Sequence, residues 1–250
     1  MTNLLEINNL SVDFPSRRGQ VAAVNKVSIA VAKGEVLGLV GESGAGKSTV
    51  GNSVINLLEP PGYISGGEII FDGTRIDQLS NEEMRKIRGA RIGTIFQDPQ
   101  TSLNPLMTIG KQLSETLIET LKISGASARE KSIELLDSVG IPNPEPRLDA
   151  YPHQFSGGMR QRVVIALALA GDPDLIIADE PTTALDVSIQ KQILDLIKSL
   201  CKQRNLGVII VTHDIGVIAE IADRVAVMYN GQLVEQGKVE QVLQKPKHDY

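Results

Sequence analysis

The feature that most constrains this chain is a glycine-rich segment from Gly41 to Ser48, GESGAGKS. It fits the pattern G-x-x-x-x-G-K-[ST], follows the apolar run VLGLV and precedes apolar residues at helical spacing, so it predicts a strand, a turn and a helix. This arrangement is typical of a phosphate-binding loop, because glycine lets the main chain curl around a triphosphate and present its N–H groups. A chance glycine-rich turn rarely meets all of these conditions at once.

The loop also predicts which groups contact a nucleoside triphosphate and its magnesium ion. Lys47 is expected to reach the β- and γ-phosphates, and Ser48 to supply a hydroxyl to Mg²⁺. The helix that begins near Lys47 points the positive end of its dipole at the anion. The loop alone does not say which nucleotide is bound, or for what purpose. The residues predicted to bind the nucleotide here are Gly41, Glu42, Ser43, Gly44, Ala45, Gly46, Lys47, Ser48 and Thr49.

Composition narrows the class of protein. With 250 residues, 42% of them hydrophobic, the chain can bury a sizeable core as one large domain or two small ones. The net charge of −5 argues against a nucleic acid bound by bulk electrostatics. The single cysteine, Cys201, leaves no disulfide framework and no cysteine metal cluster, which fits a reducing cytosol, and it is expected to pack as a small residue on a helix. No signal peptide or membrane-spanning run is apparent, so a role at a membrane would need a partner.

The order of apolar patterns predicts an α/β chain. Alternation over residues 4–32 predicts an antiparallel sheet, and Ser80 with Glu83 predicts a capping box at a helix start. Helical patterns fill residues 109–139 and are followed by an expected proline-rich loop from Ile141 to Pro146. Apolar strands and helices then alternate to the end, which predicts a mostly parallel sheet with covering helices.

Two adjacent carboxylates follow an apolar strand in the segment DLIIADE, residues 174–180. Neighbouring side chains at a strand end point in different directions, so Asp179 can support Mg²⁺ while Glu180 faces a water for in-line attack. Phosphoryl transfer needs this division of roles, because its catalysis consists of positioning the reacting groups and neutralising their charge. Alone the pattern is weak, but behind a phosphate-binding loop it predicts nucleotide hydrolysis.

At this point the chain resembles the nucleotide-binding subunit of an ATP-binding-cassette (ABC) transporter, over essentially its whole length. The most specific segment is FSGGMRQR, residues 155–162, which is similar to the signature motif of that family. A serine and two glycines at a helix start form an anion site of hydroxyl, N–H groups and dipole. The resemblance implies that Ser156, Gly157 and Gly158 contact the ATP bound by a partner subunit, so that two subunits sandwich two nucleotides.

Further residues match family motifs in the same order along the chain. The resemblance implies that Gln97 touches the Mg²⁺ and attacking-water region and senses the membrane subunits. It implies that His213 contacts the γ-phosphate and that Asp186 lies in a loop crossing the subunit interface. Phe14 matches the aromatic residue on which adenine stacks, which favours ATP over GTP. Each match is weak alone, and the shared order carries the argument. The resulting expectation is that Glu180, His213, Gln97 and Lys47 are catalytic and that Ser48, Gln97 and Asp179 hold the metal.

The resemblance also implies a fold. We expect a P-loop NTPase with a RecA-like, mostly parallel sheet, an N-terminal antiparallel β subdomain and an inserted α-helical subdomain. The chain is then a single ABC ATPase domain over residues 1–250. Its nucleotide-binding core takes residues 1–97 and 160–250, and the helical subdomain with the signature motif takes residues 98–159.

Several segments are most similar to ATPases of the peptide and nickel importers, among them FSGGMRQR, FQDPQTSLNP, YPHQ and ADEPTTALDVSIQ. Phe155 and Met159 stand where the commoner signature has Leu and Gln, as is usual in that group. This similarity implies ATP and Mg²⁺ as cofactors and a place at the cytoplasmic face of the cell membrane. It implies as partners a second ABC ATPase subunit, the same or related, two transmembrane permease subunits and, indirectly, a substrate-binding protein, but no nucleic acid.

Alternative functions remain within the same nucleotide-binding family. Chromosome and repair ATPases usually insert a coiled coil or a zinc module, and residues 98–155 show neither sustained heptads nor cysteines. Translation-associated proteins usually carry two cassettes, whereas this chain has one. Only the similarity to ATPases of the peptide and nickel importers argues against an exporter subunit. Many importer ATPases continue beyond the position of Tyr250, so the chain is expected to be a short member or a truncated one. Its cargo cannot be identified, since cargo does not touch this subunit.

Overall fold

The computed structural model describes residues 3–16, 19–183 and 185–250. The chain forms two compact units, each with its own strands and helices. The first combines Met1–Arg85 with Leu200–Tyr250, and the second is Lys86–Ser199.

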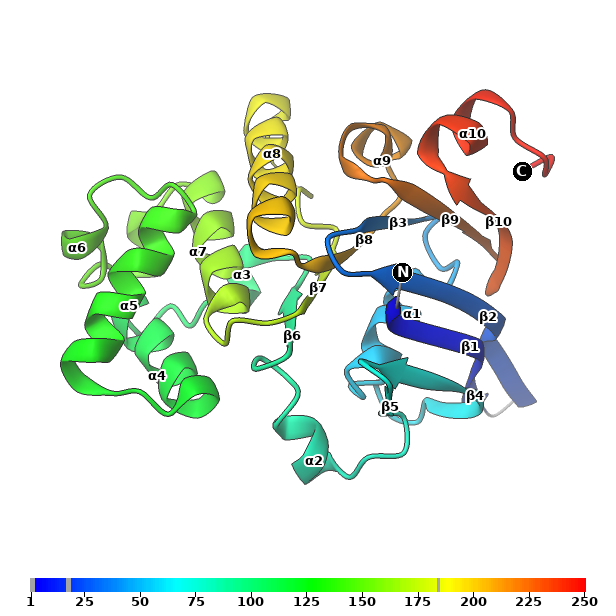
Figure 1. Cartoon of the computed structure of the whole chain (residues 1–250), viewed down its shortest axis with the longest axis horizontal. Coiled ribbons are helices and arrows are strands. Elements are labelled where there is room, and N and C mark those ends of the chain that lie inside the picture. Colours follow the sequence, from blue (N-terminus) through cyan, green and yellow to red (C-terminus); the bar gives the residue numbers. More distant parts are fainter. Residues whose placement is uncertain (1–2, 17–18, 184) are drawn as a thin grey trace. The chain divides into compact units, whose positions relative to one another are not determined.

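The first unit contains an antiparallel sheet in the order β2-β1-β4-β5 (Figure 1). Alternate residues of β1 are buried on each side of a register shift, Leu5 and Ile7 before it and Leu10 and Val12 after it, as the period of two predicts. The expected N-terminal antiparallel sheet is therefore confirmed. Its strands are β1 (Asn3–Ser16), β2 (Gly19–Ala32), β4 (Tyr63–Phe71) and β5 (Thr74–Arg75).

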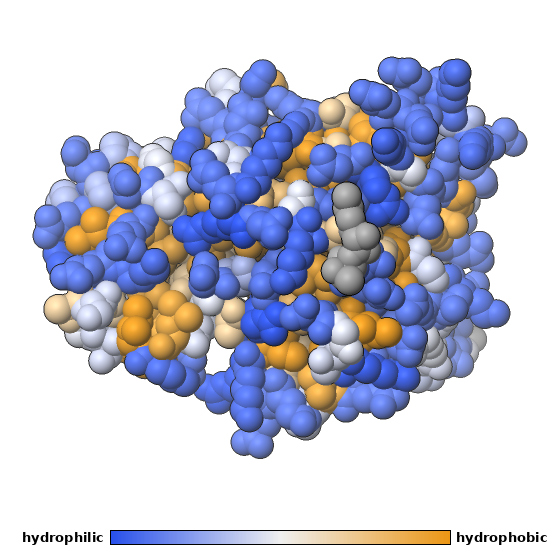
Figure 2. Space-filling view, viewed as in Figure 1, coloured by the Kyte–Doolittle hydropathy of each residue, from blue (hydrophilic) through white to orange (hydrophobic). Residues whose placement is uncertain are grey.

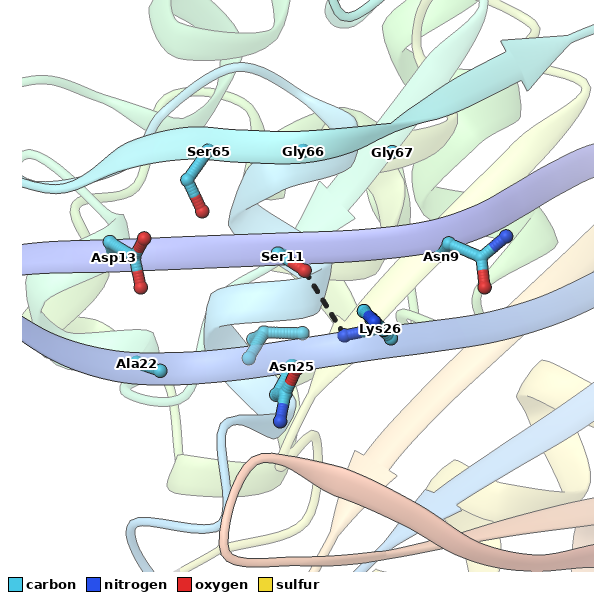
Figure 3. Close-up of a pocket in the computed structure, with 10 residues that line it drawn as sticks. Asn9, Ser11, Asp13, Ala22, Asn25, Lys26, Ser65, Gly66 and Gly67 are labelled. Carbon is cyan, nitrogen blue, oxygen red and sulfur yellow. Dashed lines mark hydrogen bonds between the residues drawn. The ribbon is translucent and has the colours of Figure 1, made fainter.

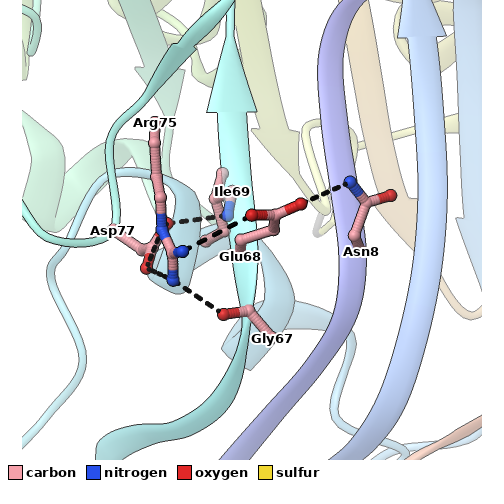
Figure 4. Close-up of polar contacts among 6 residues, drawn as sticks. All are labelled: Asn8, Gly67, Glu68, Ile69, Arg75 and Asp77. Carbon is pink, nitrogen blue, oxygen red and sulfur yellow. Dashed lines mark hydrogen bonds and ion pairs between the residues drawn. The ribbon is translucent and has the colours of Figure 1, made fainter.

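Polar contacts on this sheet fix the short strand β5 to β4 (Figure 4). The guanidinium of Arg75 donates to Asp77 at 3.0 Å, to the carbonyl of Gly67 at 3.1 Å and to Glu68 at 3.4 Å. Asn8 of β1 donates to the other carboxylate oxygen of Glu68. The network joins three strands.

A hollow of about 590 Å³ lies against the same sheet and is lined mainly by polar residues of β1, β2 and β4 (Figure 3). Within it, the Ser11 hydroxyl accepts a hydrogen bond from the Lys26 backbone N–H. The sheet therefore turns an apolar face to the core and a polar one to the hollow.

A second group of strands in this unit includes β3, the strand that precedes the glycine-rich segment. Strand β3 pairs in parallel with β8 and β9, and β10 pairs antiparallel with β9. Every residue of β3 and β8 is buried, as expected for parallel strands covered on both faces. The elements are β3 (Val36–Val40), α1 (Lys47–Val54), α2 (Asn81–Arg85), β8 (Gly207–Thr212), α9 (Ile215–Ile221), β9 (Arg224–Tyr229), β10 (Gln232–Lys238) and α10 (Val239–Gln244).

The second unit has two parallel strands and most of the helices. Its fold agrees with the expected insertion of helices between strands. Its elements are β6 (Ile92–Ile95), α3 (Pro99–Ser102), α4 (Ile109–Leu121), α5 (Gly125–Ser138), α6 (Pro144–Arg147), the 3₁₀ turn η1 (Pro152–Gln154), α7 (Gly157–Leu169), β7 (Leu175–Asp179) and α8 (Val187–Arg204), which runs on into the first unit.

Local predictions are largely confirmed. The capping box exists, with the Ser80 N–H donating to Glu83 at 2.8 Å and the Glu83 N–H donating to the Ser80 hydroxyl at 3.3 Å. The loop expected from Ile141 to Pro146 is wrong in its second half, because a helical turn begins at Pro144, where the fixed φ of proline suits a first helical position. The boundaries 98–159 of a helical subdomain stay a prediction.

Cys201 is buried on α8, as expected of a packing residue. Its thiol donates to the carbonyl of Leu206 at 3.0 Å, and burial raises the pKa of this thiol to about 11. Cys201 is therefore a poor nucleophile at neutral pH. Over the part of the chain that the structure describes, none of the helices is long and apolar enough to cross a membrane.

Candidate functional site

The glycine-rich segment connects β3 to α1 and follows the backbone path that its sequence predicts. Gly46 has φ +94°, and a Cβ there would lie 2.4 Å from the carbonyl oxygen of Ala23. A Cβ at Gly41 would lie 2.2 Å from the carbonyl oxygen of Met228. Both positions therefore require glycine, the first for its left-handed backbone and both for the close approach of another strand.

Lys47 is the first residue of α1 and is only 6% exposed. Its ammonium group donates to the carbonyl of Gly41 at 2.7 Å and to that of Glu42 at 2.8 Å. The cation is thus folded beneath its own loop. Ser48, next on the helix, is exposed, as are Glu42, Ser43 and Gly44 on the outer arm of the loop. The loop therefore offers exposed main chain around a buried positive charge, which suits a phosphate group.

Phe14 lies near the end of β1 and is half-buried. A Cβ on Gly62 would lie 2.5 Å from Cε1 of the Phe14 ring and 2.6 Å from Cζ. Glycine at position 62 therefore leaves room for this ring. Stacking of adenine on it stays a prediction.

His213 follows β8 directly and is exposed. The next residue, Asp214, caps α9 by accepting from the N–H of Gly216 at 2.7 Å. The N–H of Asp214 itself donates to the Thr212 hydroxyl at 3.0 Å. These bonds fix the backbone on the C-terminal side of His213, which places this residue at the end of a buried strand.

In the second unit, the structure brings together two residues that the sequence predicted separately. Gln97 follows β6, Glu180 follows β7, and the amide nitrogen of Gln97 donates to Oε2 of Glu180 at 3.0 Å. The Thr183 hydroxyl donates to the same oxygen at 2.8 Å. Two donors thus orient one carboxylate. Thr183 was missed by sequence reasoning, although its place three residues after Glu180, in a turn, is a signal for such a bond.

The backbone at Glu180 is also unusual. Its φ is +46°, the left-handed region that a residue with a Cβ rarely adopts. Strain of this kind is found most often at functional sites, where the surrounding structure imposes it. Asp179, the last residue of β7, and Glu180 are both half-buried, and the division of roles between the two carboxylates stays a prediction.

The segment FSGG begins α7. Ser156 is the N-cap, and its hydroxyl accepts from the N–H of Met159 at 3.3 Å. Phe155 is buried, whereas Ser156 and Gly157 are exposed. A Cβ on Gly158 would lie 2.6 Å from Cγ2 of Ile189, a residue of α8. The start of α7 therefore presents N–H groups and a hydroxyl at the surface.

Asp186 precedes α8 and is exposed. Its carbonyl accepts from the N–H of Gln190 at 2.8 Å, so its place is fixed by the first turn of the helix. Its place at a subunit interface stays a prediction.

Comparison with known proteins decides the family. A sequence profile of the ABC transporter family matches residues 24–183. The chain is 53% identical to the oligopeptide transport ATP-binding protein OppD of Bacillus subtilis, over 100% of this chain and 70% of that protein. It is 50% identical to the dipeptide transport ATP-binding protein DppD of the same organism, over 100% of this chain and 75% of that protein. The chain belongs to the ABC transporter family.

Solved structures agree with this assignment. The ATP-binding cassette MJ0796, in a dimeric post-hydrolysis state bound to ADP and Pi, superposes with a TM-score of 0.82 at 31% identity, covering 94% of this chain and 98% of that one. The cassette cbiO1 of Clostridium perfringens, part of the ABC transporter complex cbiONQ, gives 0.84 at 29% identity, covering 98% and 92%. This ABC protein is therefore an ATPase with the P-loop NTPase fold, as predicted.

The site residues of this ABC ATPase are divided between its two units. The phosphate loop, Phe14 and His213 are in the first unit, and Gln97, Ser156, Asp179, Glu180 and Asp186 are in the second. Within the second unit the structure shows that Gln97 and Glu180 are in contact. The role of each residue in binding or catalysis stays a prediction.

Proposed function

We propose that this ABC ATPase powers the import of peptides through a membrane permease. The observation that carries the proposal is the identity of about half, over the whole chain, to proteins named for oligopeptide and dipeptide transport. Nickel or a metal chelate, the other cargo predicted from the sequence, has no comparable support.

In this proposal Lys47 and the loop N–H groups hold the phosphates of ATP. Glu180 orients the attacking water. Two hydrogen bonds to Oε2 of Glu180 support this role, from the amide nitrogen of Gln97 at 3.0 Å and from the hydroxyl of Thr183 at 2.8 Å. A carboxylate so held keeps its geometry as charge develops in the transition state. His213 contacts the γ-phosphate from the end of β8.

The donor set fits a magnesium ion. Ser48 offers a hydroxyl, Asp179 a carboxylate and Gln97 an amide oxygen, since the amide nitrogen of Gln97 is the atom that donates to Glu180. Oxygen donors are the ligands that Mg²⁺ prefers, and the ion would neutralise charge on the phosphates. Among the described residues, no group of three or more His, Cys, Asp or Glu side chains is placed to hold a metal ion.

A second ATPase subunit, the same or related, completes the site in this proposal. Ser156, Gly157 and Gly158 would contact the γ-phosphate bound by the partner subunit, and Asp186 would lie at the interface. Support comes from the exposed start of α7 and from the dimeric state of the similar cassette MJ0796.

The permease is proposed to contact the second unit, over residues 97–108, at the cytoplasmic face of the membrane. This unit exposes large apolar side chains, with Leu106 86% exposed and Phe96 48% exposed. Hydrophobic side chains also gather over the part of the surface where α4 lies (Figure 2). A contiguous group of exposed apolar side chains is typical of a protein interface, and this supports the proposed docking surface. The substrate-binding protein would act through the permease.

The first experiment is Glu180→Gln, with Glu240→Gln, an exposed residue of α10, as the matched control. We expect Glu180→Gln to bind ATP normally and to hydrolyse it about 10²- to 10⁴-fold more slowly. It should accumulate as an ATP-dependent dimer, alone or with a related subunit, as measured by light scattering. Ser156→Arg should abolish this dimer. Fast hydrolysis by Glu180→Gln would contradict the catalytic assignment.

The second experiment tests the cargo and the permease. The chain, purified with its permease and binding protein, should raise its ATPase rate with peptides and not with nickel chelates. A cross-linker at the exposed Thr101 should reach a membrane subunit. Cross-links formed only from residues 233–250 would mean that the docking surface is wrong, and stimulation by a chelate alone would overturn the peptide assignment.

A further inference from the structure

The last six residues of the chain fold back onto the first unit. The carboxylate of Glu235, on β10, accepts from the N–H groups of Lys247 at 2.9 Å and His248 at 3.0 Å. These two backbone hydrogen bonds lower the pKa of Glu235. The N–H of Tyr250 donates in turn to Nδ1 of His248 at 3.1 Å. The segment is therefore held by polar contacts that end at Tyr250.

The side chain of Tyr250 reaches the phosphate-binding loop. Its ring packs against that of Tyr229, at the end of β9, with centroids 4.6 Å apart and an angle of 38°. Its hydroxyl oxygen accepts a hydrogen bond from the backbone N–H of Glu42 at 3.2 Å. A residue 208 positions away thus contacts the exposed outer arm of the loop.

One peptide group connects this contact to Lys47. The carbonyl of Gly41 and the N–H of Glu42 belong to the same peptide plane. Lys47 donates to the carbonyl end at 2.7 Å, and Tyr250 accepts from the N–H end. A hydrogen bond at one end of a peptide polarises the other end and fixes the orientation of the plane.

We propose that Tyr250 is a positioning residue for ATP binding, which holds the Gly41–Glu42 peptide so that Lys47 is in place before nucleotide arrives. The N–H of Glu42 then serves the shape of the loop, while the N–H groups that follow it contact phosphate. A loop ordered in advance loses less conformational entropy when ligand binds. The contact therefore acts on affinity for nucleotide and leaves the chemical step alone.

The test compares two single-atom deletions in the full chain. Tyr250→Phe removes the hydroxyl that contacts the loop, and Tyr229→Phe removes a hydroxyl from the other ring of the same pair. We expect Tyr250→Phe to raise KM for ATP and the Kd of a fluorescent ATP analogue about two- to tenfold, with kcat unchanged, because one neutral hydrogen bond is lost. Tyr229→Phe should leave all three constants unchanged.

Amide hydrogen exchange distinguishes the loss of this one contact from a general loss of folding. Exchange at Glu42 should quicken in Tyr250→Phe, while the amides of β3 stay protected. Equal constants and equal exchange in the two variants would overturn the proposal, as would a fall in kcat with KM unchanged. The inference rests on the phosphate-loop assignment, so Lys47→Ala is measured beside it. If Lys47→Ala loses ATP binding and Tyr250→Phe does not, only the role of Tyr250 is wrong.

Discussion

Two helices of the chain, α1 and α7, begin next to glycine-rich segments, yet their starts are built differently. The residue before α1 is Gly46, with φ +94°, and the first residue is the buried cation Lys47. The residue before α7 is Ser156, with the ordinary values φ −64° and ψ 165°, and its hydroxyl caps the helix. The start of α1 is a loop that encloses the ammonium group of its own Lys47. The start of α7 is a capped helix, whose N–H groups can contact a ligand that is bound by another subunit.

This difference has a consequence for binding. A cradle with left-handed backbone and an internal cation can hold a phosphate within one subunit. A helix N-terminus alone contributes a partial charge and a few donors, worth much less. We therefore expect α1 to govern binding of ATP to a single chain and α7 to govern association of two chains.

The largest expected effect comes from Lys47→Ala. Removal of the cation from the cradle should weaken ATP binding and lower turnover by about 10²-fold or more, since charged donors to a phosphate are among the strongest contacts in such sites. Equilibrium binding of a fluorescent ATP analogue and the ATPase rate measure this effect. Lys111→Ala, at an exposed position of α4, is the control. Unchanged hydrolysis in Lys47→Ala would remove the phosphate-loop assignment.

A smaller effect is expected from alanine substitutions that compare the backbone conformation of the two glycine-rich segments. Gly46→Ala places a Cβ at φ +94° and 2.4 Å from a carbonyl oxygen, so we expect it to cost at least about 1–2 kcal/mol of stability and to impair ATP binding. Gly157→Ala meets only Leu185, with Cδ2 at 3.7 Å, an ordinary contact. It should leave stability unchanged within about 0.5 kcal/mol and ATP binding to a single chain intact.

Urea unfolding and nucleotide binding measure this pair. If the two alanine variants behaved alike, the two helix starts would not differ as the geometry indicates. A large loss in Gly157→Ala alone would reverse the comparison.

Sequence reasoning succeeded where the signal is local. The loop at Gly41–Ser48 and the capping box at Ser80 depend on residues a few positions apart, so spacing alone predicted them. The strand before Asp179 was found for the same reason, since a continuous apolar run predicts a buried strand. The family resemblance added the order of the remaining motifs.

Contacts between distant residues were not predictable from spacing. Gln97 and Glu180 are 83 positions apart and meet because each follows one of two paired parallel strands. The carboxyl ends of paired parallel strands lie at the same edge of a sheet, so that pairing, once known, predicts the contact. No comparable rule reaches Tyr250, whose bond to Glu42 depends on how the chain folds back after α10.

The smallest expected effect distinguishes a cap from a binding group. Ser156 caps α7 and Thr108 caps α4, where its hydroxyl accepts from the N–H of Lys111 at 3.4 Å. Loss of either hydroxyl should cost about 1 kcal/mol of stability, so Ser156→Ala and Thr108→Ala should unfold at similarly reduced urea concentrations. Because only the Ser156 hydroxyl is proposed to contact ATP on a second subunit, Ser156→Ala alone should weaken the ATP-dependent dimer of Glu180→Gln. Light scattering across an ATP titration measures that difference. If both alanine variants kept the dimer, Ser156 would act as a helix cap and nothing more, and the start of α7 would lose its proposed share in the nucleotide site.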